Sequence, residues 1–189
     1  MRSLQTKDLP NIISMLRLVA VAPVVYLLAL EQFGWGLLLF ALAGLSDGVD
    51  GFLAKKYGWQ SRLGGILDPL ADKALLIGCY LVLGVMALIP LWLTLAVVLR
   101  DLIIVCGGLL YHHLVAHVRA TPSFLSKINT LVQILLVVAV IANAGPLPLP
   151  GFWIETLIWI CLTTTLLSGL LYVVVWGRMA VHNWPRHQA

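Results

Sequence analysis

The sequence predicts an all-α, polytopic membrane protein: a six-transmembrane-helix bundle with both termini in the cytoplasm. Of its 189 residues, 61% are hydrophobic and only 11% are charged, and the mean hydropathy is +0.99. A soluble globular domain is about half apolar and about one quarter charged. Because so few charges cannot cover the surface in water, we expect the chain to be solvated by lipid. Its length is that of one domain, which we expect to comprise residues 1–189.

Six apolar segments are long enough to cross a bilayer, which takes about 20 apolar residues each. Turn signals separate them, among them the polar run 55–62, Pro90 and the GPLPLPG stretch at 145–151. The predicted spans are 12–31, 34–54, 64–88, 91–116, 124–143 and 152–176.

The basic residues lie on one side of these spans. The first, third and fifth connecting loops contain no Lys or Arg, whereas both termini and the second and fourth loops contain them. Because positively charged loops stay in the cytoplasm, both termini should face inward. The net charge of +4 is thus a topology signal with some attraction to anionic headgroups, and it does not indicate a nucleic-acid partner. Neither a signal-peptide cleavage site nor a mitochondrial presequence is evident, which favours a bacterial inner membrane.

Four of the eight acidic residues fall in one stretch, SDGVDGFLAKKYGWQSRLGGILDPLADK, at the junction of the second and third predicted spans. Acidic residues are rare inside spans, and those present are usually functional. Since residues three or four apart share a helix face, the stretch contains two stripes. The first stripe is Asp47, Asp50, Gly51 and Ala54, and the second is Gly64, Asp68 and Asp72.

The depth of the carboxylates supports their convergence. At about 1.5 Å per residue, Asp50 and Asp68 each lie about 7 Å from the loop ends, and Asp47 and Asp72 lie about 12–13 Å from them. The four side chains can therefore meet as two layers in one pocket near the cytoplasmic surface. Because like charges in low dielectric repel strongly, either some are protonated or cations lie among them. An all-oxygen set suits Mg²⁺, Mn²⁺ or Ca²⁺, and paired ions commonly serve displacement at phosphorus.

Two simpler interpretations compete with a metal site. Each Asp could cap a helix end or pair with Lys or Arg. For a single Asp this explanation is as good as a metal-ligand role, but it does not explain four Asp residues in two facing stripes. A calcium loop fails, because DGVDG lacks the alternating ligands and the Glu of an EF-hand. The small residues of the stripes leave room for a bulky ligand. Positive charge at the rim, as a diphosphate substrate would require, comes from Lys55, Lys56 and Arg62.

These residues resemble the signature of the CDP-alcohol phosphotransferase family, D-x-x-D-G-x-x-A-R followed after eight residues by G-x-x-x-D-x-x-x-D. All seven residues of the two stripes match it in type and spacing. Lys55 stands where the family has Arg, which keeps the charge but loses the bidentate fork. The PNIISMLR stretch at 10–17 and LDPLADK at 67–73 are similar to the phosphatidylglycerophosphate and cardiolipin synthases of this family. The stretch TPSFLSKINTLVQ from Thr121 most resembles the CMP-forming cardiolipin synthases.

The resemblance implies an enzyme that moves the phosphatidyl group of CDP-diacylglycerol to an alcohol and releases CMP. It implies two divalent ions, Mg²⁺ or Mn²⁺, on Asp47, Asp50, Asp68 and Asp72, with Asp72 also the general base on the acceptor hydroxyl. The favoured acceptor is phosphatidylglycerol, giving cardiolipin, and the alternative is glycerol 3-phosphate, giving phosphatidylglycerophosphate. Family members are often dimers, so a homodimer is implied by analogy. The nucleotide-binding residues would be Asp47, Gly51, Ala54, Lys55 and Gly64.

Outside the carboxylate stretch and the first and last four residues of each predicted span, the remaining charges are Arg17, Arg100 and Asp101. As sequence neighbours, Arg100 and Asp101 should point in different directions on a helix. An arginine in the membrane either contacts a phosphate of the acceptor or forms a structural ion pair, for instance with a carboxylate of the cluster. Ser126 and Asn129, at the start of the fifth span, are further candidates for holding the acceptor headgroup. The charged candidates for acceptor or phosphate binding are Arg17, Arg62, Arg100, Arg119 and Lys127.

Two other classes of protein remain open. A cation or proton transporter would use intramembrane Asp residues as a relay, but it should have acids near the bilayer midplane and two related halves. Here the acids lie near one surface, and no symmetry between halves is visible. A catalytically inactive scaffold would have no need of all four carboxylates.

Overall fold

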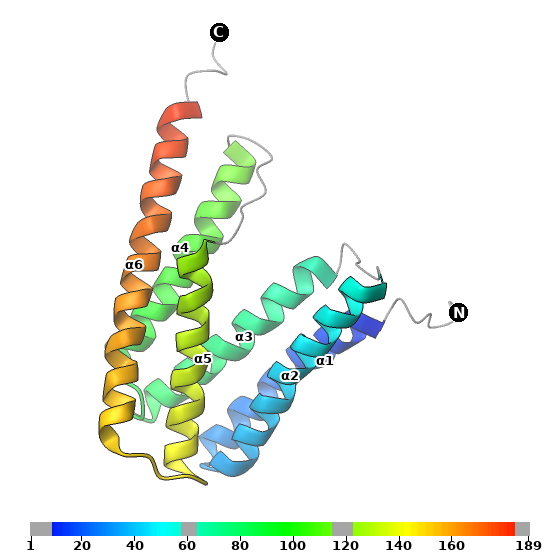
Figure 1. Cartoon of the computed structure of the whole chain (residues 1–189), viewed down its shortest axis with the longest axis vertical. Coiled ribbons are helices and arrows are strands. Elements are labelled where there is room, and N and C mark those ends of the chain that lie inside the picture. Colours follow the sequence, from blue (N-terminus) through cyan, green and yellow to red (C-terminus); the bar gives the residue numbers. More distant parts are fainter. Residues whose placement is uncertain (1–8, 58–63, 115–122, 184–189) are drawn as a thin grey trace. The chain divides into compact units, whose positions relative to one another are not determined.

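The computed structural model describes residues 9–57, 64–114 and 123–183, and the side chains of 13–46, 70–107, 123–175, 177 and 178. These residues form helices joined by turns, as the all-α prediction requires (Figure 1). The helices are α1 (Leu9–Ala29), α2 (Phe33–Tyr57), α3 (Gly64–Val85), α4 (Leu91–Leu114), α5 (Phe124–Ala144) and α6 (Gly151–Asn183).

Each predicted span corresponds to one of these six helices in the described part of the chain. The prediction of an all-helical protein is confirmed, and most helix ends agree within a few residues. The largest difference is at the C-terminal end of α6, which continues to Asn183, beyond the predicted end at 176. Apolar runs predict where a helix crosses lipid, but a helix can continue into the polar region beyond the run.

Two of the tight turns use the same hydrogen-bond pattern. After α1, Gln32 N–H donates to the carbonyl of Leu27 and Glu31 N–H donates to that of Leu28, both at 2.9 Å. Glu31 has a φ of 60°, so this turn is a Schellman motif with a residue other than glycine in the left-handed position. Ala87, with a φ of 58°, occupies the same position after α3. The motif satisfies the last carbonyls of each helix, which must find partners where water is absent.

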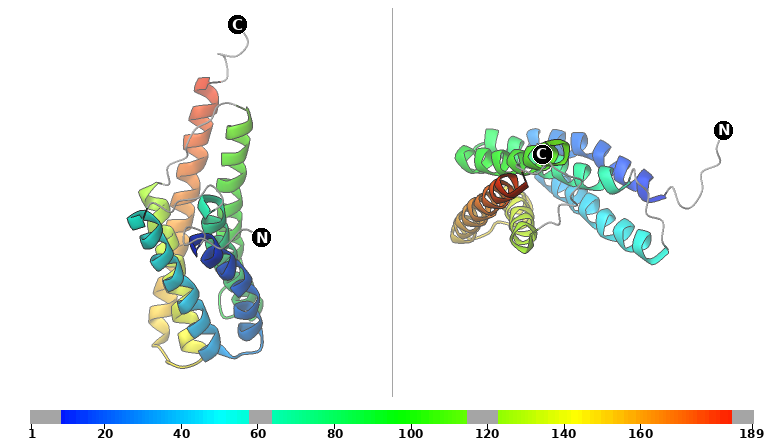
Figure 2. Two further views of the ribbon diagram at one scale, coloured as in Figure 1. Left: turned by 90° about the vertical axis from the view of Figure 1, so that its right-hand side faces the viewer. Right: turned by 90° about the horizontal axis from the view of Figure 1, so that it is seen from above.

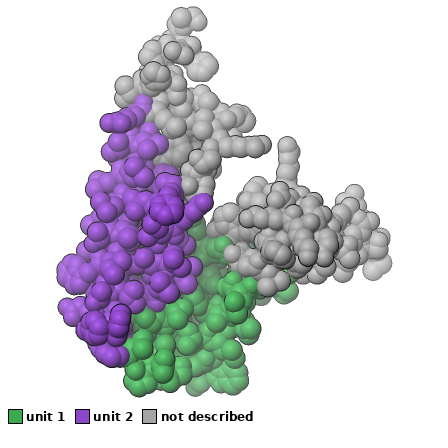
Figure 3. Space-filling view, viewed as in Figure 1, with its two compact units in different colours: residues 1–88, 137–149 green, residues 89–136, 150–189 purple. Residues whose placement is uncertain are grey.

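The described structure contains two compact units (Figure 3). Unit 1 is Met1–Leu88 with Val137–Leu149, and unit 2 is Ile89–Leu136 with Pro150–Ala189. The boundary between the units falls inside α5, since its last turns belong to unit 1 and its first turns to unit 2. The expectation of a single domain over 1–189 stays a prediction.

In unit 1, α1 packs along both α2 and α3, while α2 and α3 contact each other over a short stretch (Figures 1 and 2). A Cβ atom added to Gly78 would lie 3.0 Å from Cγ2 of Val25 and 3.3 Å from Cγ1 of Val21. Glycine at this position therefore allows α1 to approach α3 closely. The buried apolar side chains of this unit include Val24, Leu28, Ala71, Leu75, Cys79, Tyr80 and Leu83.

In unit 2, α4 packs along α6, and the first turns of α5 join both helices through polar contacts. The rings of Trp92 on α4 and Trp159 on α6 lie with their centroids 6.0 Å apart. Aromatic pairs at such distances add to the burial energy of the two helices.

Large apolar side chains cover the outside of the described helices. Leu45 is 68% exposed, Trp35 65% and Val85 82%. Within the described residues, two helices are long and apolar enough to span a membrane, 124–144 and 151–175, and two shorter apolar helices are 13–29 and 33–46. An apolar exterior of this extent is costly in water and favourable in lipid. It agrees with an integral membrane protein.

Candidate active site

The backbone confirms that both predicted carboxylate stripes lie on helices. Asp47 and Asp50 fall within the uninterrupted α2, and Asp68 and Asp72 fall within α3. The two helices belong to unit 1 and contact each other. The helical spacing on which the stripe prediction depends is therefore present on two neighbouring helices.

Several predicted site residues lie outside the part that the structure describes. Arg62 and Arg119 are outside the described residues altogether. The convergence of the four carboxylates stays a prediction, with Asp72 as the one member whose side chain is described. The site residues whose side chains lie outside the described set are Asp47, Asp50, Gly51, Ala54, Lys55, Gly64 and Asp68.

Asp72 forms an ion pair with Arg17 of α1. The Nη1 atom of Arg17 donates a hydrogen bond of 2.6 Å to Oδ1 of Asp72. The side chain of Arg17 is 0% exposed, whereas that of Asp72 is 48% exposed. The sequence leaves two roles open for an intramembrane arginine, phosphate binding and an ion pair with a carboxylate of the cluster. The structure contains the ion pair.

The inner face of α1 fixes the position of Arg17. Ser14, Arg17, Val21 and Val24 follow one another at three- and four-residue intervals, so they share a helix face. Ser14, Arg17 and Val24 are buried, and Val21 faces Gly78 of α3. A guanidinium on such a packed face has little freedom to turn away from its carboxylate.

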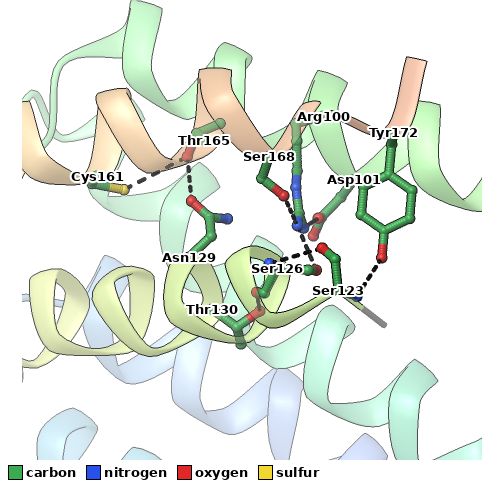
Figure 4. Close-up of polar contacts among 10 residues, drawn as sticks. All are labelled: Arg100, Asp101, Ser123, Ser126, Asn129, Thr130, Cys161, Thr165, Ser168 and Tyr172. Atoms are coloured by element: carbon green, nitrogen blue, oxygen red, sulfur yellow. Dashed lines mark hydrogen bonds and ion pairs between the residues drawn. The ribbon is translucent and has the colours of Figure 1, made fainter. Parts of the chain in front are cut away.

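Arg100 of α4 is the centre of a second polar cluster, in unit 2 (Figure 4). Its Nη1 donates to Oδ1 of Asp101 at 2.6 Å, and its Nη2 donates to Oγ of Ser126 at 2.7 Å and of Ser168 at 2.6 Å. Arg100 and Asp101 are each 5% exposed. The expectation that these neighbours point apart does not hold for their polar ends, because the guanidinium and the carboxylate are in direct contact.

The cluster continues along α5 and α6 (Figure 4). Thr165 donates to Oδ1 of Asn129 at 2.9 Å, and Sγ of Cys161 lies 4.0 Å from the hydroxyl of Thr165. The backbone N–H of Ser126 donates to Oγ of Ser123, an N-cap that begins α5. Polar side chains of three helices therefore meet in the interior of unit 2.

The α6 residues of this cluster are absent from the sequence-based candidates. A signal for them exists, since Cys161, Thr165, Ser168 and Tyr172 recur at four-, three- and four-residue intervals on the last span. Small hydroxyl residues give a weak signal, however, because they can satisfy themselves by bonding to the carbonyl four residues earlier. Thr163 and Thr164 do this with Trp159 and Ile160.

Two buried donors of this cluster have no hydrogen-bond partner among the described residues. They are Nε of Arg100 and Nδ2 of Asn129, and Asn129 is fully buried. Most buried polar groups in proteins are paired with protein or with ordered water. These donors can bond to a water or ligand oxygen. By contrast, the predicted acceptor contact Lys127 is exposed on α5.

The chemistry of the predicted ligands fits a divalent metal ion. Carboxylate oxygens are hard donors that suit Mg²⁺ or Mn²⁺. Asp72 has such a carboxylate, half-exposed and anchored at one oxygen. Among the residues whose side chains are described, no three acidic, His or Cys side chains lie together as metal ligands would. Asp72 is the one predicted ligand in this described set.

Comparison with known proteins agrees with these observations. The family described as CDP-alcohol phosphatidyltransferase matches residues 7–177. The "Cardiolipin synthase (CMP-forming)" of Rattus norvegicus is 35% identical over 190 residues, which cover 92% of this chain and 62% of that protein. The human protein of the same name is 39% identical over 151 residues, covering 71% of this chain and 50% of that protein.

A third relative is named for a different activity. The "CDP-diacylglycerol--glycerol-3-phosphate 3-phosphatidyltransferase" of Bacillus subtilis is 30% identical over 182 residues, covering 87% of this chain and 93% of that protein. The chain thus spans between half and two thirds of the two cardiolipin synthases and nearly all of the bacterial protein. Since the family match extends over most of the chain, including both stripes and Arg17, the chain belongs to the CDP-alcohol phosphatidyltransferase family.

Proposed function

We propose that this protein is a CMP-forming phosphatidyltransferase that moves the phosphatidyl group of CDP-diacylglycerol to phosphatidylglycerol and so makes cardiolipin. The observation that carries the proposal is the complete carboxylate motif on two contacting helices, α2 and α3, within the region that matches the family. The similarity to two cardiolipin synthases supports phosphatidylglycerol as the acceptor.

The proposed reaction is a displacement at phosphorus. The acceptor hydroxyl oxygen bonds to the phosphorus that carries diacylglycerol, and the bond from that phosphorus to the bridging oxygen breaks. CMP leaves with the electron pair, and the hydroxyl proton passes to the carboxylate of Asp72 as general base. Mg²⁺ or Mn²⁺ ions, held by Asp47, Asp50, Asp68 and Asp72, would neutralise charge on the diphosphate and on the leaving group.

The other residues of the two stripes have binding roles in this proposal. Asp47, Gly51, Ala54 and Gly64 border the cytidine nucleotide, with the small residues leaving room for it. Lys55 offers a cation to the diphosphate in place of the family's arginine, as a point charge without the paired contacts of a guanidinium. Arg62, Arg119 and Lys127 are the proposed contacts for the acceptor or its phosphate. Arg100 is a proposed contact through its Nε atom alone, which has no partner among the described residues, since its Nη atoms are bonded to protein side chains.

The proposed location is the inner membrane of a bacterium, with the site and both termini facing the cytoplasm. The concentration of Lys and Arg in alternate loops supports this orientation. In that arrangement soluble CMP leaves on the cytoplasmic side, while the lipid substrate and product stay in the bilayer. A homodimer is also proposed, by analogy with the family.

Glycerol 3-phosphate is the second candidate acceptor. One observation favours it: the Bacillus subtilis relative, whose name includes glycerol 3-phosphate, has nearly all of its length covered by this chain. The two acceptors share a hydroxyl as the attacking group and differ in whether the rest of the molecule is a lipid. The product would then be phosphatidylglycerophosphate.

A direct assay tests both acceptors. The purified protein in detergent micelles is given labelled CDP-diacylglycerol, Mg²⁺ and one acceptor at a time, and released CMP and lipid products are separated. We expect CMP and cardiolipin with phosphatidylglycerol. Phosphatidylglycerophosphate with glycerol 3-phosphate alone would replace the first candidate by the second. Absence of CMP with either acceptor would contradict the enzyme proposal and favour a transporter or a scaffold.

A further inference from the structure

We infer that Arg17 is a positioning residue, which holds the carboxylate of Asp72 in its working orientation, and that it does not grip a substrate phosphate. The inference rests on the proposed function, because Arg17 acts through the proposed base. It assigns a role to a residue for which the sequence alone leaves phosphate binding and ion pairing open. The observation behind it is the 2.6 Å contact between Nη1 of Arg17 and Oδ1 of Asp72.

The two ends of this ion pair differ in exposure. The side chain of Arg17 is fully buried on the inner face of α1, whereas nearly half of the side-chain surface of Asp72 is accessible. A residue that captures a substrate phosphate must present its guanidinium to the substrate. Arg17 instead presents its guanidinium to Asp72, and Asp72 is the partner that a ligand can reach.

A purely stabilising role explains this arrangement less well. A buried ion pair is often no more stable than apolar residues of similar volume, because removing the charges from water is costly. A pair with one end open to solvent also gains less from the attraction between its charges. Stability alone therefore does not account for a buried arginine whose partner is open to solvent, and orienting a reactive carboxylate does.

The surroundings of Arg17 suit a positioning role. Functional groups must be held within about 0.5 Å of their productive geometry by residues whose own side chains are fixed by packing. Arg17 is followed on the same face of α1 by Val21, and Val21 and Val25 contact α3 at Gly78. The guanidinium is thus attached to the helix that packs closely against the helix of Asp72.

Steady-state kinetics of Arg17→Lys and Arg17→Met test the inference. Partners that orient metal-binding or catalytic groups typically contribute about 10- to 100-fold to activity, so we expect kcat of Arg17→Met to fall by that factor. The KM values for CDP-diacylglycerol and for the acceptor should stay at the wild-type level. Arg17→Lys keeps the charge without the planar fork, so it should recover part of the lost kcat.

A neighbouring residue supplies the control. Leu16 is 62% exposed on the outer face of α1, so Leu16→Ala changes the same helix without touching the pair. It should leave kcat and both KM values unchanged. Wild-type elution volume and melting temperature in detergent will show that each variant is folded.

A second measurement does not depend on activity. The melting temperatures of Arg17→Met, Asp72→Ala and the double variant form a double-mutant cycle. Residues in direct contact give losses that do not add, so the double variant should lose less than the sum of the two single losses. Additive losses would contradict the ion pair itself.

The kinetic outcomes separate the possibilities. A raised KM with unchanged kcat in the Arg17 variants would overturn the inference in favour of phosphate binding, because uniform binding affects KM alone. Wild-type kcat and KM in both variants would overturn it as well. If the wild-type protein releases no CMP, the proposed function is contradicted, and so is the positioning role of Arg17. If the wild-type protein is active and the Arg17 variants are unaffected, only this inference is contradicted.

Discussion

The two arginine–aspartate pairs of this protein have the same hydrogen-bond length and opposite surroundings. In unit 1, Nη1 of Arg17 lies 2.6 Å from Asp72, whose side chain is 48% exposed. In unit 2, Nη1 of Arg100 lies 2.6 Å from Asp101, whose side chain is 6% exposed. The first pair joins two helices and its carboxylate is accessible, so we call it the open pair. The second pair lies within one helix and both of its side chains are buried, so we call it the sealed pair.

The partners of each arginine add to the difference. Nη2 of Arg100 also bonds to Ser126 of α5 and Ser168 of α6, so one guanidinium connects three helices. Such a sealed, multiply bonded charge is suited to holding helices in register. The open pair leaves its carboxylate accessible, as a group that must meet a substrate or an ion requires. The length of an ion pair therefore says less about its role than the exposure of each end.

Substituting the acid of the open pair should have the largest effect on activity. Asp72→Asn keeps the size of the side chain but removes the proposed base, so we expect kcat to fall by about 10²- to 10⁴-fold. The melting temperature in detergent should fall as well, because the buried guanidinium of Arg17 loses its counter-charge, but by less than in Asp101→Asn, since the carboxylate of Asp72 is half-exposed. CMP release by the purified variant measures the effect, and activity near the wild-type level would contradict the base assignment.

Substituting the acid of the sealed pair should instead have the largest effect on stability. Asp101→Asn leaves the buried guanidinium of Arg100 without its counter-charge, and we expect a loss of about 3–5 kcal/mol in the free energy of unfolding. Unfolding by a denaturing detergent, followed by circular dichroism, provides the measurement. An unchanged unfolding midpoint would show that the sealed pair does not support the fold.

A double variant sharpens that result. In Arg100→Met with Asp101→Leu both charges are replaced by apolar side chains, and stability should return towards the wild-type value, since apolar replacements of buried pairs are often neutral. Loss of acceptor binding in a stable double variant would support the proposed contact between Arg100 and the acceptor. Retained acceptor KM would leave Arg100 with a structural role.

The smallest of these effects concerns a single hydroxyl group of the sealed cluster. Ser168→Ala removes one of the hydrogen bonds to the guanidinium of Arg100, and we expect a loss of about 1–3 kcal/mol in the free energy of unfolding. Thr163→Val on the same helix is the control, because Thr163 is exposed and bonds to its own helix. Equal losses in the two variants would mean that the cluster contributes nothing specific to stability.

Much of the fold could be predicted from the sequence because lipid imposes a simple rule on it. Long apolar runs must be helical, so the positions of all six helices followed from composition. The turns were harder, since Glu31 and Ala87 adopt a left-handed conformation that glycine usually provides. Periodicity places a residue on a face of its helix, and in this way it predicted the stripes that contain Asp72.

Contacts between helices could not be predicted in the same way. Arg17 and Asp72 are separated by 55 positions, and periodicity does not say which faces of two helices meet. The contact between Arg100 and Asp101 depends on side-chain flexibility, which helix geometry alone ignores. Ser168 was missed because a serine within a helix can bond to a carbonyl of its own helix, so its presence alone does not indicate a partner on another helix.

The close approach at Gly78 has a consequence for how this protein can change over time. Gly78 lies about 9 Å along α3 from Asp72, and it has no side chain with which to react. Yet a single methyl group there would lie 3.0 Å from Val25 and 3.3 Å from Val21, so these two side chains of the helix that bears Arg17 would have to give by a few tenths of an ångström. A search for functional positions that counts only polar residues would overlook it. Natural variation at such a silent contact can tune the speed of a reaction without altering any of the groups that perform it.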